Sequence, residues 1–171
     1  MKHTAPALAA SGLLALAIAA AATPAIAARS PWHLGSDDGG PMLSAGEGED
    51  VTASLHCKAH AGRIEAMFLV EHAVADHLQG STWMDKAGHK APWAVTVHAA
   101  SGAVAADIPG KANADEMNGG SEINFSVPVA APVAQAFAAS GALKLTAFGE
   151  TPKIPPAPAA IAAKFVKSCA K

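Results

Sequence analysis

Two cysteines, Cys57 and Cys169, are the only ones in the 171-residue chain, and most of the sequence lies between them. The chain begins with a leader typical of exported proteins, and exported chains meet an environment in which thiols oxidise. Two cysteines allow one intramolecular pairing, so the sequence predicts a Cys57–Cys169 disulfide. The alternatives are two buried free thiols or a reactive redox pair, but the C-x-x-C spacing of redox dithiols is absent. A fold for this chain must therefore bring two distant segments together.

The leader has the three parts of a secretory signal peptide. Lys2 supplies a positive charge, residues 7–22 form an apolar stretch, and Ala25, Ile26 and Ala27 make an A-x-A cleavage site. The apolar stretch is mostly alanine and short for a membrane span. We therefore expect residues 1–27 to be a signal peptide and the mature chain to be periplasmic or secreted, without a membrane anchor.

The composition limits the core and the partners. Hydrophobic residues make up 51% of the chain, yet aromatic residues make up only 5% and tyrosine is absent, so the core must be rich in alanine. The net charge is −2, and removal of Lys2 with the signal peptide makes it more negative by one unit. Nucleic acid is excluded as a main partner, because a phosphate backbone requires a basic surface.

The mature chain divides into a lead and one domain. Residues 28–50 are rich in glycine and acidic residues and have few large apolar side chains. Burial of so little apolar surface does not offset the conformational entropy that the segment would lose on folding. We expect a flexible acidic lead over 28–50 and a single α+β domain over 51–171.

Alternation of polar and apolar residues predicts most of the strands. It is clearest at 51–58, where Cys57 falls on the apolar face. A turn-rich polar loop is expected at 109–121, and the segment 74–78 is ambiguous. The predicted strands are 51–58, 63–71, 93–98, 104–108, 123–129 and 143–148.

Two helices are expected near the C-terminus. Pro132 and Gly141 bracket a short apolar segment, as proline in the first turn and glycine after the last turn commonly do. Over 159–169, Ile161, Phe165 and Cys169 recur every four residues and form one apolar stripe. The predicted architecture is α+β: a small curved antiparallel β-sheet with a short helix and a C-terminal helix packed on it.

The segment from Trp83 to Trp93 is the candidate binding site. Its two tryptophans flank a polar loop that contains His89, and exposed rings at these positions would form a stacking platform. The competing interpretation makes the tryptophans core residues that close a sheet edge. The binding hypothesis assigns Trp83, Trp93 and His89 to recognition of an uncharged or weakly charged protein, peptide or saccharide.

The sequence carries no catalytic signature: the nucleophile elbow, the P-loop, the dinucleotide fingerprint and the zinc-protease motif are all absent. No residue is assigned as catalytic and no cofactor is expected. A non-catalytic binding or accessory domain is favoured. The alternative is a small hydrolase or metal-handling protein whose site assembles from dispersed residues such as His72, Asp76 and His98.

His56, Cys57 and His60 are residue types that bind metals, but their spacing in a strand does not bring them together. In a strand, His56 and Cys57 point to opposite faces, and His60 lies about 13 Å from His56 at the rise of an extended chain. A metal site needs three or four convergent ligands, so no metal site is predicted.

The signal peptide gives the first testable prediction. Signal peptidase is expected to cut after Ala27, so that N-terminal sequencing of the exported protein starts at Ala28. Recovery of the chain in a membrane fraction with Met1 intact would contradict this prediction.

Overall fold

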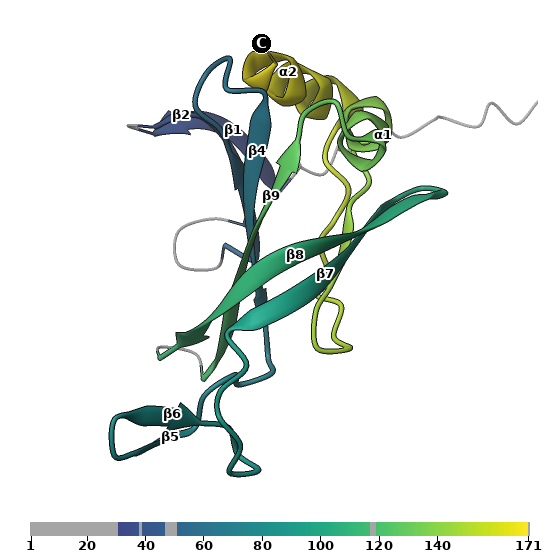
Figure 1. Cartoon of the computed structure of the whole chain (residues 1–171). Helices are drawn as coiled ribbons and strands as arrows, with labels where there is room; N and C mark the ends of the chain where they lie inside the picture. The colour runs from purple at the N-terminus through teal and green to yellow at the C-terminus, as the bar shows by residue number, and fades with distance from the viewer. Residues whose placement is uncertain (1–30, 38, 47–50, 117–118, 171) are drawn as a thin grey trace, which may run out of the picture.

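A computed structural model describes residues 31–37, 39–46, 51–116 and 119–170 (Figure 1). They form a curled antiparallel sheet of eight strands in the order β1-β2-β3-β4-β9-β8-β7-β10, a separate hairpin of β5 and β6, and two helices. The predicted α+β class with a curved antiparallel sheet is confirmed. The strands are β1 Trp32–Asp37, β2 Gly40–Ala45, β3 Ala53–His56, β4 Arg63–Val70, β5 His77–Gln79, β6 Thr82–Met84, β7 Ala94–Ser101, β8 Val104–Asp115, β9 Gly120–Pro128 and β10 Lys144–Thr146. The helices are α1 Pro132–Ser140 and α2 Ala159–Cys169.

The alternating pattern places apolar side chains on one face of the sheet. In β4, Ile64, Ala66 and Phe68 are buried, whereas Arg63 and Glu65, which alternate with them, are exposed. The same alternation continues through β3 and β9, and neighbouring strands are paired so that their buried residues lie opposite one another. This face, which we call the inner face, carries the core.

The helix pair covers one end of the inner face, as Figure 1 shows. α1 contacts β7 and β8, α2 contacts β2 and β4, and the two helices contact each other. The pair therefore joins the two halves of the curled sheet. Both helices lie where the sequence predicted them. Within the described ranges, no helix has the length and apolar character to cross a membrane.

Gly141 fixes the exit from α1. It adopts a left-handed φ of 70° and donates its N–H to the Phe137 carbonyl, which closes the last turn of the helix. A Cβ at this position would collide with the Ala157 carbonyl oxygen. The close approach of the segment that leads into α2 thus requires glycine here.

The predicted flexible lead is wrong where the structure describes it. Residues 32–37 and 40–45 form β1 and β2, which pair with each other, and β2 also pairs with β3. Trp32 is 3% exposed, lies 6.3 Å from the Phe137 ring and donates its indole N–H to Pro155 O at 2.6 Å. Burial of this large side chain with its polar atom satisfied offsets the ordering of a glycine-rich segment. Residues 28–30, 38 and 47–50 lie outside the described ranges.

The loop predicted at 109–121 is also wrong in its first half, because β8 continues through it to Asp115. Before Gly110, β8 pairs with β7 alone, and its pairing with β9 begins at Gly110. Pro109 lacks an N–H, and it falls where β8 has only one neighbouring strand. Beyond it, Ala112 is buried on the inner face opposite Ile123. The alternation therefore resumes with alanine, whose small side chain gives a weak apolar signal.

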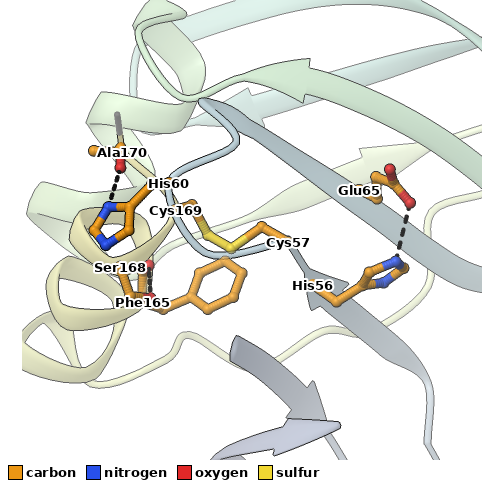
Figure 2. Close-up of a disulfide and its surroundings, with 8 residues drawn as sticks. All are labelled: His56, Cys57, His60, Glu65, Phe165, Ser168, Cys169 and Ala170. Atoms are coloured by element: carbon orange, nitrogen blue, oxygen red, sulfur yellow. Dashed lines mark hydrogen bonds and ion pairs between the residues drawn. A yellow bond between two sulfur atoms is a disulfide. The ribbon is translucent and has the colours of Figure 1, made fainter. Parts of the chain in front are cut away.

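The predicted Cys57–Cys169 disulfide is present, with the two Cα atoms 5.7 Å apart (Figure 2). Cys57 directly follows β3 and is 2% exposed, and Cys169 ends α2 and is fully buried. The bond attaches the C-terminal helix to the third strand of the sheet.

Backbone hydrogen bonds reinforce this attachment, because the turn between β3 and β4 caps the end of α2. The N–H of Gly62 donates to Cys169 O at 2.8 Å, and the N–H of His60 donates to Ser168 O at 3.3 Å. The His60 ring nitrogen Nδ1 lies 2.8 Å from Ala170 O (Figure 2). Carbonyls in the last turn of a helix lack partners within the helix, so the turn supplies them.

Loss of the disulfide is expected to destabilise the fold strongly. The cysteines are 112 positions apart, and closing a loop of this length is worth about 4 to 5 kcal/mol in the chain-entropy model. A C57A/C169A variant should therefore lose about this much free energy of unfolding in urea titrations. Reduced wild type serves as the control and should match the variant. A variant as stable as the oxidised wild type would contradict this account.

Candidate functional site

The segment from Glu71 to Trp93 leaves the large sheet at the end of β4 and returns to it at the start of β7. We call this segment the arm. Its strands β5 and β6 form a sheet of their own, beyond the end of the large sheet that lies away from α1 and α2 (Figure 1). The arm contains every residue that the sequence assigned to binding.

A tight hairpin forms the outer part of the arm. Leu78 pairs directly with Trp83, and Gln79 with Thr82, across a turn in which Gly80 takes a left-handed φ of 64°. Glycine adopts this conformation without the steric penalty of a Cβ. Directly paired residues of an antiparallel hairpin project from the same face, so Leu78 and Trp83 share one face of the arm.

The segment around Ala91 lies beside β6 and completes the arm. The N–H of Ala91 donates to Trp83 O at 2.9 Å, which joins this segment to the strand. In the connecting loop, a carboxylate oxygen of Asp85 accepts the backbone N–H of His89 at 2.8 Å. That hydrogen bond is the largest cause that lowers the pKa of Asp85 below its usual value. The ionised Asp85 side chain thus holds the loop closed at neutral pH.

Exposed apolar side chains are concentrated on the arm. In the described part of the chain, the large hydrophobic residues with exposed side chains are Leu78 at 55%, Trp83 at 37% and Trp93 at 36%. Trp93 lies at the base of the arm, where its N–H donates to Ala91 O and its carbonyl accepts the N–H of Ala112. We call Leu78, Trp83 and Trp93 the apolar edge.

The structure tests one of the two interpretations of the tryptophans, the one that places them in the core. Neither Trp83 nor Trp93 closes the core, so the core-residue interpretation is wrong for both, and Trp32 is the tryptophan that fills the core. His89 lies on the same arm with its side chain 78% exposed and its Nδ1 atom 3.4 Å from an Asp85 carboxylate oxygen. Whether these residues bind a partner stays a prediction.

Leu78 was not singled out from the sequence. It lies in the segment 74–78 that was left ambiguous, because a strand of three residues is too short to show alternation. The available signal was Gly80-Ser81, a dipeptide typical of two-residue hairpin turns, between Leu78-Gln79 and Thr82-Trp83.

The base of the arm is fastened to the large sheet by Ser121. Its buried hydroxyl donates to His72 O at 2.6 Å and accepts the N–H of Val74 at 2.9 Å. The His72 ring stacks on Phe148 with centroids 4.4 Å apart, and its backbone N–H donates to Glu150 at 3.0 Å. The start of the arm is therefore held against the large sheet by these contacts.

The structure does not assemble the dispersed histidine and aspartate site. His72 stacks on Phe148, Asp76 lies 3.0 Å from His77 Nδ1, and His98 lies 2.9 Å from Asp107 across β7 and β8. His72, Asp76 and His98 thus each contact a different partner. Among the described residues, no group of three or more histidine, cysteine, aspartate and glutamate side chains is placed to hold a metal ion.

An open cleft of about 780 Å³ lies at the same end of the large sheet. Glu71, Asp115 and Glu150 line it together with Lys153, and Glu150 already accepts the His72 N–H. Carboxylates around an open cleft do not by themselves form an acid and base pair, which requires environments that separate their pKa values. The lining alone therefore does not assign a reaction to the cleft.

No protein-family model, curated protein or solved structure matches the chain. Function is therefore inferred from the chain's own residues. The feature that calls for a functional explanation is the apolar edge on a projecting arm.

Proposed function

We propose that the protein is an exported, non-catalytic binding domain, and that its arm inserts the apolar edge into an apolar pocket of a partner protein. The observation that carries the proposal is the exposure of Leu78, Trp83 and Trp93 on one projecting arm. Large exposed apolar groups cost solubility, so a cluster of them favours an interaction surface.

The shape and chemistry of the arm favour a protein over a small ligand. Sites for small molecules are usually concave, whereas the arm projects from the sheet (Figure 1). Leu78, the most exposed of the three, is aliphatic and offers no flat ring for a sugar to stack on. Tryptophan at the centre of a protein interface commonly contributes a large share of the binding energy.

Charges beside the apolar edge favour a weakly charged partner. The loop next to Trp83 carries Asp85, Lys86 and Lys90, so negative and positive charges are mixed there. Such a rim gives little long-range steering, and it resembles the polar rim around an interface core.

Export is supported by two independent features. The disulfide suits an oxidising compartment, because thiols in a reducing cytosol rarely stay paired. The leader sequence at 1–27 has the form of a signal peptide, although it lies outside the described residues.

Replacement of Leu78 and Trp83 in the apolar edge is expected to weaken binding without unfolding the domain. A benzophenone amino acid at position 83, in cells that export the protein, should crosslink one partner protein that mass spectrometry identifies. With that partner purified, an L78S/W83S variant should bind at least about 30-fold more weakly than wild type, since a central residue often contributes 2 kcal/mol or more.

The matched control is Q79A/T82A, which changes the neighbouring residue pair of the same hairpin, on its opposite face. This variant should bind as wild type does, and both variants should keep the thermal midpoint of the domain, because β5 and β6 stand apart from the large sheet. Equal crosslinking from positions 82 and 83, or unchanged affinity of L78S/W83S, would contradict the proposal. Binding of free saccharides that requires Trp83 would assign the arm to sugars instead.

A further inference from the structure

Two methionines and a histidine occupy neighbouring positions on three adjacent strands. In the sheet register, Met42 of β2 lies directly opposite His56 of β3. Ser54 of β3 lies opposite Met67 of β4, so Met67 is the diagonal neighbour of His56. All three side chains are half-buried, whereas the residues that alternate with them in β3 and β4 are buried on the inner face. Met42, His56 and Met67 therefore share the outer face.

Their spacing suits a common ligand. Directly opposed residues on one face of a sheet have Cβ atoms about 5 Å apart, and diagonal neighbours are about 7 Å apart. Methionine has three rotatable side-chain bonds and adapts its position readily. The thioethers of Met42 and Met67 can thus reach the imidazole of His56 from the strands on either side of it.

The His56 ring is already oriented by a carboxylate. Its Nε2 atom lies 3.0 Å from Glu65 Oε2, and Figure 2 shows the ring turned toward Glu65. In a neutral ring, the tautomer with its proton on Nε2 donates to this carboxylate and leaves the lone pair of Nδ1 for a metal. Histidines that bind metals commonly donate their other ring N–H to a carboxylate in this manner.

We propose that Met42, His56 and Met67 bind Cu(I), with Glu65 as the positioning residue for His56. Thioether sulfur is a soft ligand that selects Cu(I), and its close chemical analogue Ag(I), over harder divalent ions. Thiolates do not compete in the oxidised protein, because Cys57 and Cys169 are bonded to each other. The absence of a convergent histidine and carboxylate cluster among the described residues argues against a zinc site here.

A second pair on the arm follows the same pattern. Met84 lies directly opposite His77, whose Nδ1 atom is 3.0 Å from Asp76. Each methionine in the described part of the chain thus neighbours a histidine across a strand pair. The outer-face site has two thioethers and the arm pair has one, so we assign the tighter binding to the outer face.

Titration of the oxidised protein with Ag(I) tests the proposal directly. With methionine methyl groups labelled for NMR, the first equivalent should shift the Met42 and Met67 signals. Competition with bicinchoninate for Cu(I) should then show weakening of about tenfold or more in H56Q and in M42L/M67L, in which leucine keeps the volume of methionine. E65Q should weaken binding while the Met42 and Met67 methyl groups still respond.

H98Q is the matched control. Like His56, His98 lies opposite a carboxylate, here Asp107 at 2.9 Å. Its neighbour on the other side is Thr146, so it has no thioether beside it in the strand pairing. The H98Q variant should bind Cu(I) with the affinity of the wild type. Equal weakening by H98Q and M42L/M67L, or a first equivalent that leaves the Met42 and Met67 methyl groups unshifted, would overturn the proposal. The wild-type methyl shifts and H56Q decide the outcome even if M42L/M67L folds poorly.

Discussion

The covalent link between the start of the β3–β4 turn and the end of α2 is the constraint on which the other features depend. The Cys57–Cys169 disulfide bonds the end of α2 to the sheet. Beside it, the backbone N–H groups of His60 and Gly62 donate hydrogen bonds to carbonyls in the last turn of the helix. α2 in turn packs against α1, and the pair contacts strands from both halves of the curled sheet. In a core with few aromatic residues, this link compensates for limited apolar burial.

The two faces of the sheet and the arm have different chemical roles. Aliphatic residues and a few aromatic rings fill the inner face. The rings of Phe68 and Phe125 meet edge to face, with their centroids 6.2 Å apart. The outer face carries polar residues together with Met42, His56 and Met67. Exposed large apolar side chains in the described chain are confined to the arm, which is anchored at its base by Ser121. This arrangement agrees with the proposed binding role, because binding residues are commonly carried by segments that a scaffold positions.

Local signals in the sequence predicted the strands 51–58 and 63–71, both helices and the disulfide pairing, because each depends on periodicity, capping or cysteine count. β1 and β2 were missed because the glycine and acidic residues of the segment 28–50 predicted a flexible lead. The burial of Trp32 depends on α1 and on Pro155, which are distant in the sequence. The outer-face cluster was beyond sequence reasoning for a different reason. Met42, His56 and Met67 become neighbours only through strand register, which the alternation of residues does not specify across separate strands.

The disulfide and the β3–β4 turn hold α2 on the sheet. The contribution of the disulfide can be measured by amide hydrogen exchange, followed at individual residues in the oxidised and the reduced protein. Reduction is expected to accelerate exchange at Gly62 and throughout α2 before it affects the paired amides of β8 and β9. Exchange in α2 that is unchanged by reduction would contradict this expectation, because the helix would then be held on the sheet without the disulfide.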